Sequence, residues 1–168
     1  DLVAKEKMHN ASAIAGMAFT NAFLGINHSL AHKLGGEFHI THGRSNALLL
    51  PHVVKFNGRK PDKFATFPKY GHYVADEKYA RVARYLGLPC ATKEEGVQSL
   101  VAAIWGLMER LHMPTSIKDC DINEKAFMEK VGELAEHAFE DQCTTANPVY
   151  PLISQLEQIY KDAYAGTR

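Results

Sequence analysis

Four of the chain's nine histidines crowd into one short stretch, GINHSLAHKLGGEFHITHG. Imidazole is the commonest protein ligand for metals, so this crowding points to metal chemistry. On a helix, His28 and His32 stand four residues apart and share a face. The HxxxH spacing alone is a weak signal, however. Ser29 follows His28, where the helix of a zinc protease carries a glutamate.

His42 strengthens the metal interpretation. We expect it just before a second helix, where backbone N–H groups and the helix dipole disfavour a positive charge. A metal ligand must be a neutral imidazole, so this position suits one. A glycine turn after the first helix would bring His42 back toward His28, and we predict that these two bind one cation. His39, in the connector between the helices, is predicted to lie on the surface without a functional role.

The metal site predicted from this chain is incomplete. A tetrahedral site needs three or four protein ligands, and no aspartate or glutamate stands at a spacing that would complete a set with His28 and His42. The other histidines carry simpler predictions. His52, just after Pro51, is predicted to be a packing residue. Solvent exposure or helix capping is predicted for His9, His72, His112 and His137.

The elements that would position these histidines are all predicted to be helices. A proline-free, alanine-rich stretch predicts one long helix over residues 5–34, ended by Gly35-Gly36. Apolar residues on nearly every face of it predict burial in a larger assembly. Residues 37–41 would form a short connector. A second helix is predicted over residues 43–56, with a kink at Pro51, whose ring removes a backbone donor.

The rest of the chain also reads as helical, after a loop over residues 57–71 that is rich in lysine, proline and glycine. Thr92 and Asp121 each precede a glutamate by three residues, which predicts a capped helix start. No stretch shows the period-two alternation of a strand. The predicted fold class is therefore all-α, a helical bundle forming one domain over residues 1–168. Its later helices are predicted at 75–86, 93–111, 123–138 and 151–163.

Composition excludes several classes of protein. Lysine plus arginine equals aspartate plus glutamate, at 19 each, which argues against a nucleic-acid binder. The three cysteines form no CxxC pair, so neither a disulfide framework nor a thiolate zinc site is expected, and a reducing cytoplasm is the natural setting. No apolar run is long enough to span a membrane. Because the chain opens at Asp1 rather than methionine, we expect a piece of a longer protein.

Two motifs occur together at a specific separation, AGxAFxNAxLGxxHxxAHxLG and HGxxNAxLLPxVxxFN, within residues 13–57. This block resembles the metal-site signature of iron-containing (group III) alcohol dehydrogenases. The opening AKEKMHNASAIAGMAF and the late stretch DQCTTANPVYPLISQLEQIYKDAYAG resemble the alcohol dehydrogenase portion of bifunctional aldehyde-alcohol dehydrogenases. The resemblance covers essentially the whole chain. It departs at Thr41 and Val149, where the family usually has proline and arginine.

The resemblance implies a division of labour between two halves. In that family an N-terminal α/β half binds NAD, and a C-terminal all-helical half supplies the metal site; this chain matches only the second. The metal takes an aspartate and a histidine from upstream helices, which have no counterpart here, and two histidines fourteen residues apart. His28 and His42 match these two in spacing and context. His32 matches a histidine beside the substrate that relays a proton.

The resemblance further implies a reaction, the NAD-dependent interconversion of short aldehydes such as acetaldehyde and primary alcohols such as ethanol. The family's metal is Fe²⁺, although three imidazoles and a carboxylate accommodate Zn²⁺ equally well. The chain alone is expected to be inactive. The implied partners are the substrate, the missing NAD-binding half, and further copies in a homo-oligomer or filament. Two alternatives stay open, a non-catalytic helical metal-binding domain and a helical interaction module with packed histidines.

Overall fold

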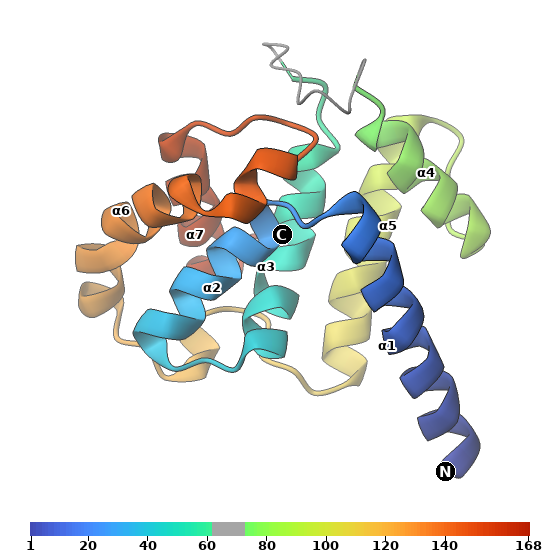
Figure 1. The fold of residues 1–168 in the computed structure, drawn as a ribbon, viewed down its shortest axis with the longest axis horizontal. Coiled ribbons are helices and arrows are strands. Elements are labelled where there is room, and N and C mark those ends of the chain that lie inside the picture. Colours follow the sequence, from blue (N-terminus) through green and yellow to red (C-terminus); the bar gives the residue numbers. More distant parts are fainter. Residues whose placement is uncertain (62–72) are drawn as a thin grey trace.

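The computed structural model describes residues 1–61 and 73–168, and these form helices without any strand. The predicted all-α fold is therefore confirmed for this part of the chain. Two short 3₁₀ helices, η1 and η2, lie on either side of α6 (Figure 1). In chain order the elements are α1 (Leu2–Ala22), α2 (Ile26–Phe38), α3 (His42–Asn57), α4 (Ala75–Tyr85), α5 (Lys93–Arg110), η1 (Lys118–Cys120), α6 (Glu124–Glu140), η2 (Gln142–Ala146) and α7 (Ile153–Ala165).

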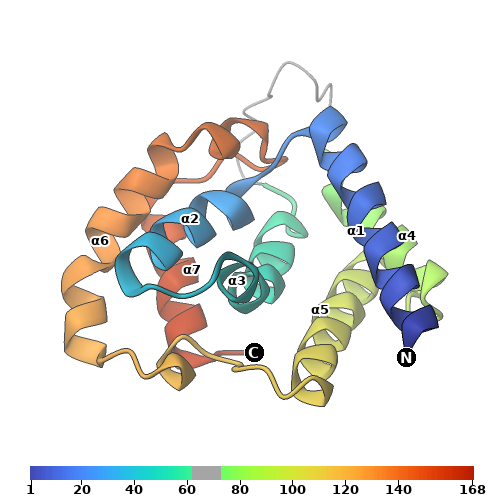
Figure 2. The same cartoon turned by 60° about the horizontal axis from the view of Figure 1, so that its bottom comes forward.

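The core is built around α2, which packs against α3, α6 and η2 (Figures 1 and 2). Leu30 and Leu34 of α2 are wholly buried, in one cluster with Leu48 of α3 and Phe127 of α6. Tyr160 of α7 is equally buried and donates its hydroxyl hydrogen to the Leu30 carbonyl oxygen at 2.7 Å. Each buried side chain of this size stabilises the fold by about 1.5–3 kcal/mol. This core therefore fixes α2 firmly against its neighbours.

The single helix predicted over residues 5–34 is wrong, because the structure has two helices there. The chain breaks at Phe23, where φ is 64°, and α2 begins at Ile26. Asn147 sets the break, since its Oδ1 accepts a hydrogen bond from the Ile26 N–H at 3.3 Å. A Cβ at Gly25 would lie 2.8 Å from that same oxygen. Local sequence favours an unbroken helix, but a contact from 121 residues away decides the geometry.

The glycine pair does not end the helix either. α2 continues past Gly35 and Gly36 and ends at Phe38, and the next residue, His39, adopts the left-handed conformation with φ 55°. Gly35 serves a different purpose, because a Cβ there would lie 2.8 Å from the Ile40 carbonyl oxygen. A side chain at this position would push the returning chain away from α2. Glycine thus allows the tight return that places His42 beside α2.

α3 is longer by one residue at each end than the predicted helix over residues 43–56, and it continues through Pro51. Its last residue, Asn57, is buried and exchanges amide hydrogen bonds with Asn147, at 3.1 Å and 2.7 Å. The predicted loop over residues 57–71 therefore begins later than expected. Residues 62–71 of that loop lie outside the described residues.

The predicted helix caps have mixed outcomes. Thr92 caps α5 as predicted, since its hydroxyl accepts a hydrogen bond from the Glu95 N–H at 3.1 Å. The cap predicted at Asp121 is wrong, because that residue lies in the left-handed region with φ 60°. Asn123 caps α6 instead, and its Oδ1 accepts from the Ala126 N–H at 3.2 Å. The cap therefore lies two residues later than the one predicted at Asp121, because Asn123 also has a side chain that can cap the helix.

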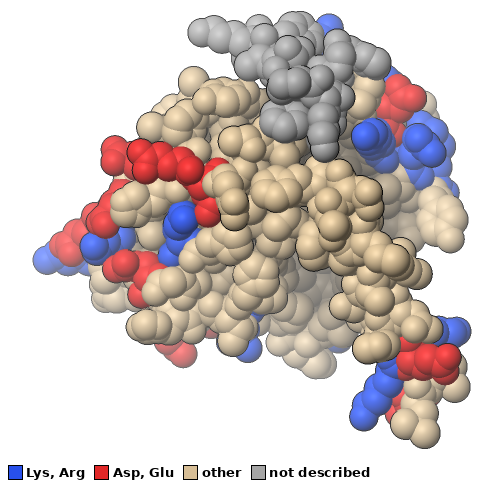
Figure 3. Space-filling view, viewed as in Figure 1, with Lys and Arg blue, Asp and Glu red and all other residues tan. Residues whose placement is uncertain are grey.

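α1 stands apart from the core, and none of its residues is buried. Figure 2 shows it at the edge of the molecule, on the side where α4 and α5 lie. Charged side chains gather at its outer end, whereas the surface nearer to α2 carries few in this view (Figure 3). Within residues 1–61 and 73–168, no helix combines the length and hydrophobicity needed to cross a bilayer. The large apolar side chains that α1 exposes are Leu2, Val3, Met8, Ile14, Met17 and Phe19.

Candidate metal centre

Three of the four crowded histidines come together where α2 passes the start of α3. His28 and His32 lie on successive turns of α2, and His42 is the first residue of α3. Their ring centroids are 6.0 Å apart for His28–His32, 5.3 Å for His28–His42 and 5.5 Å for His32–His42. We call these residues the three-histidine cluster. His39, at the end of α2, is exposed as predicted and does not belong to it.

His28 is the most enclosed member of the cluster, being half-buried where His32 and His42 are exposed. Burial lowers the pKa of His28, the neighbouring His42 and His32 rings lower it further, and Asp141 opposes them. His28 is therefore neutral at physiological pH. A neutral imidazole is the form that binds a metal, so His28 is in the form that a divalent cation requires.

Two asparagines hold the ring of His42. Asn46, one turn into α3, donates from Nδ2 to the His42 carbonyl oxygen at 3.0 Å and lies 3.1 Å from His42 Nε2. Asn27 of α2 donates in turn to Asn46 Oδ1 at 2.8 Å. An amide nitrogen can only donate, so His42 Nε2 is the acceptor and carries no proton. Its lone pair is available to a cation that displaces the amide.

A carboxylate that was not predicted from the sequence lies beside the cluster. Asp141 lies between α6 and η2, and its Oδ2 is 3.3 Å from His32 Nδ1 and 2.9 Å from Lys33 Nζ. Burial acts to raise the pKa of Asp141. Hydrogen bonds from the Cys143 N–H, Lys33 and His32 outweigh it and hold that pKa well below its ordinary value. The only local signal was an aspartate three residues after the helix predicted over residues 123–138, where a capping role is the usual interpretation.

His32, Asp141 and Cys143 form a second group that could hold a metal, with one ligand atom of each within 4.8 Å of the others. Burial and the neighbouring carboxylate raise the pKa of Cys143 to about 11. A thiol must lose its proton to bind a metal, so this one is a poor ligand. Asp141 already accepts hydrogen bonds on both oxygens. The three-histidine cluster is therefore the better candidate.

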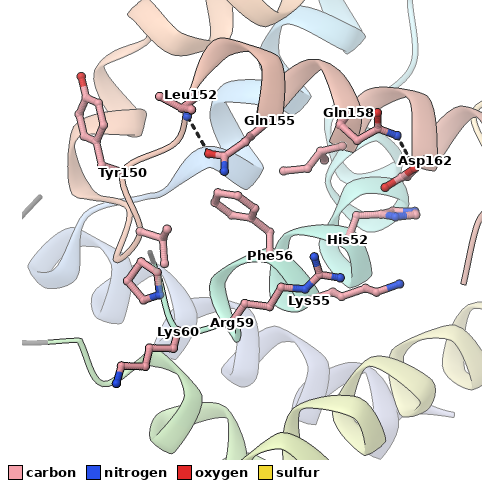
Figure 4. Close-up of a pocket in the computed structure, with 13 residues that line it drawn as sticks. His52, Lys55, Phe56, Arg59, Lys60, Tyr150, Leu152, Gln155, Gln158 and Asp162 are labelled. Carbon is pink, nitrogen blue, oxygen red and sulfur yellow. Dashed lines mark hydrogen bonds between the residues drawn. The ribbon is translucent and has the colours of Figure 1, made fainter. Parts of the chain in front are cut away.

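The other histidines in the described part of the chain lie away from the cluster. His52 is buried as predicted, and its ring packs edge-on against Trp105 with centroids 5.4 Å apart. His52 also borders a cavity of about 560 Å³ between α3 and α7, where Phe56 faces Gln155 (Figure 4). No member of the three-histidine cluster lines this cavity. Exposure is found as predicted for His9, His112 and His137, while His72 is outside the described residues.

Comparison with known proteins decides the family. The family model for the Fe-containing alcohol dehydrogenase family, C-terminal, matches residues 1–164. This chain belongs to that family. The family member "Aldehyde-alcohol dehydrogenase" of Streptococcus pneumoniae is 54% identical over 166 residues, which is 99% of this chain. The "Bifunctional aldehyde-alcohol dehydrogenase AdhE" of Escherichia coli is 46% identical over 167 residues, or 98% of this chain.

Solved structures of Fe-containing alcohol dehydrogenases share the fold. The enzyme from Thermococcus thioreducens superposes with a TM-score of 0.83 at 32% identity, over 99% of this chain and 38% of the other. A 1,3-propanediol oxidoreductase superposes with a TM-score of 0.81 at 30% identity, over 98% of this chain and 39% of the other. The chain spans only 19% of the length of the two aldehyde-alcohol dehydrogenases that it matches.

Proposed function

We propose that this chain is the metal-site part of an NAD-dependent alcohol dehydrogenase that interconverts short aldehydes and primary alcohols, acetaldehyde and ethanol among them. The three-histidine cluster, found inside a family match that covers nearly the whole chain, carries this proposal. His28 and His42 hold the cation, Fe²⁺ in preference to Zn²⁺, and His32 is the catalytic residue. NAD binds mainly to residues outside this chain, and the cytoplasm is the setting.

The chemistry divides between the cation and the protein. A bound divalent cation supplies Lewis-acid polarisation of the substrate carbonyl. His28 and His42 present ring nitrogens from two helices that the core fixes against each other. His32 turns Nδ1 toward Asp141, which leaves Nε2 to exchange a proton with the substrate oxygen. A positioned acid or base of this kind contributes roughly 10²–10⁴-fold to the rate.

The first prediction separates ligands from the proton donor in the intact enzyme that contains this chain. His28→Ala and His42→Ala each remove a ligand, so we expect both variants to lose bound metal. His32→Ala should keep its metal and lower kcat by roughly 10²-fold or more. Metal content by mass spectrometry and steady-state NADH oxidation with acetaldehyde are the measurements. The ligand assignment fails if His28→Ala and His42→Ala retain stoichiometric metal.

The chain by itself tests the rival functions. Because the upstream aspartate and histidine of the family have no counterpart here, we expect residues 1–168 to bind Fe²⁺ or Zn²⁺ weakly in equilibrium dialysis and to show no NADH-dependent aldehyde reduction. A submicromolar Kd would favour a self-sufficient metal-binding domain instead. If His28→Ala, His32→Ala and His42→Ala changed neither metal content nor rate, the interaction module would be favoured. The exposed apolar side chains of α1 support contact with a partner, either the NAD-binding half or another copy in a filament.

A further inference from the structure

The carboxylate of Asp141 is fully engaged although it lies next to solvent-accessible histidines. Its side chain is 9% exposed. Oδ1 accepts a hydrogen bond from the Cys143 N–H at 2.9 Å, which anchors the carboxylate at the start of η2. Oδ2 lies 2.9 Å from Lys33 Nζ and 3.3 Å from His32 Nδ1. Three partners from two distant parts of the chain thus fix the position of one carboxylate.

This arrangement dictates which nitrogen of His32 carries the proton. An ionised carboxylate can only accept hydrogen bonds, so a bond to Asp141 requires the hydrogen to be on Nδ1. In the neutral ring the other nitrogen, Nε2, is then unprotonated and available. A neutral imidazole in water favours the opposite tautomer, with the hydrogen on Nε2. Without Asp141 the neutral ring would therefore favour the other tautomer and lose the hydrogen bond that helps to fix its plane.

We propose that Asp141 is a positioning residue that fixes the tautomer and the ring plane of His32. It acts through His32 and touches neither substrate nor cation. Lys33, the next residue of α2, assists by holding the same Oδ2 atom. The tautomer follows from the geometry of this chain alone, whereas its effect on turnover rests on the function proposed above for His32.

The tautomer is read directly from the long-range ¹H–¹⁵N spectrum of residues 1–168 at alkaline pH without added metal. The His32 signals are assigned by their loss in His32→Gln. We expect the wild-type ring to carry its hydrogen on Nδ1. Asp141→Asn keeps Oδ1 for the Cys143 N–H but faces His32 with an amide that donates, so we expect the hydrogen to move to Nε2. A wild-type ring protonated on Nε2 overturns the proposal even if Asp141→Asn does not fold.

Asp119 offers a matched control. Its Oδ2 also accepts backbone hydrogen bonds, from the Thr115 N–H at 3.2 Å and the Ser116 N–H at 3.0 Å, and within residues 1–61 and 73–168 no hydrogen bond or ion pair joins it to a histidine. Asp119→Asn removes the same charge from a similar turn. We expect it to leave the His32 tautomer unchanged. An equal tautomer change in both variants would show a general loss of structure and overturn the proposal.

Kinetics of the intact enzyme measure the consequence. We expect Asp141→Asn to lower kcat roughly 100-fold with KM and metal content close to wild type, and Asp141→Glu to restore part of the loss. Loss of metal together with kcat would place Asp141 at the cation and overturn the positioning role. A changed tautomer with normal kcat would support the positioning of His32 and refute its proton transfer, so the two proposals fail separately.

Discussion

At the scale of single residues, the burial of His52 makes the stability of the fold depend on pH. Burial lowers its pKa to about 4, Asp162 acts to raise it, and Lys55 lowers it further. The unfolded chain therefore binds the proton more tightly than the folded one. Stability contributed by neutral His52 is present above the unfolded value of 6.5 and is lost as the pH falls toward 4.

The second prediction follows from the direction of this pH dependence. We expect the free energy of unfolding to fall by up to about 3 kcal/mol between those two pH values because of His52, at about 1.4 kcal/mol per pKa unit. His52→Gln should lack that part of the pH dependence, whereas the exposed His9→Gln should retain it. Urea unfolding of residues 1–168 over this pH range gives the comparison. An unchanged pH slope in His52→Gln would contradict the assignment.

The sequence alone predicts only part of the site. The spacing of His28, His32 and His42 is local, so their common origin on two consecutive helices could be foreseen. Asp141 could not, because it reaches His32 across 109 residues of chain. Nothing in the residues around Asp141 distinguishes a carboxylate that faces a histidine from one that caps a helix. Such a pair becomes visible only when α6 and α2 are placed side by side.

At the scale of elements, the two glycines of α2 differ in what surrounds them. A Cβ at Gly36 meets nothing within 4 Å, whereas one at Gly35 would lie 2.8 Å from the Ile40 carbonyl oxygen. Alanine normally stabilises a helix interior relative to glycine by about 1 kcal/mol. We therefore expect, as the third prediction, that Gly36→Ala stabilises the chain and Gly35→Ala destabilises it.

Chemical denaturation with a far-ultraviolet circular dichroism readout measures both variants. Gly35→Ala should also separate His42 from α2, so in the intact enzyme it should lower metal content while Gly36→Ala does not. Equal stability changes in the two variants would mean that the backbone at Ile40 can shift to accommodate the added Cβ without loss of stability.

The helices that were predicted well owe their limits to nearby residues. α5 begins after Thr92, which caps it, and α7 begins two residues after Pro151. Both signals lie within a few positions of the helix they limit. The break between α1 and α2 depends instead on Asn147, so no window of local sequence contains its cause. Prediction failed where the decisive contact is long-range.

At the scale of the whole molecule, stability is concentrated away from α1. Phe127 is wholly buried and stacks on Tyr164 with ring centroids 4.6 Å apart, whereas α1 contributes no buried residue. As the fourth prediction, deletion of residues 1–22 should shift the Tm of the isolated chain by only a few degrees. Phe127→Ala should cost about 3–5 kcal/mol.

Hydrogen exchange gives an independent check on this difference in stability between α1 and the core. In the isolated chain, amides of α1 should exchange fast, and those of α2 near Leu30 should exchange at the rate set by global unfolding. Strong protection of α1 in the monomer would contradict its exposed position, whereas protection that appears only in the intact enzyme would reveal its partner.

Asn147 has a consequence for the order of events during synthesis. It joins the start of α2 to the end of α3, yet it lies 121 residues after Ile26 and 90 after Asn57. The ribosome therefore releases the histidine-bearing helices well before the residue that ties them together. Asp141 also emerges late, so a nascent chain carries His32 without its carboxylate. The arrangement at the histidines is thus completed by residues made more than a hundred positions after His28 and His32, not by the segment that contains them.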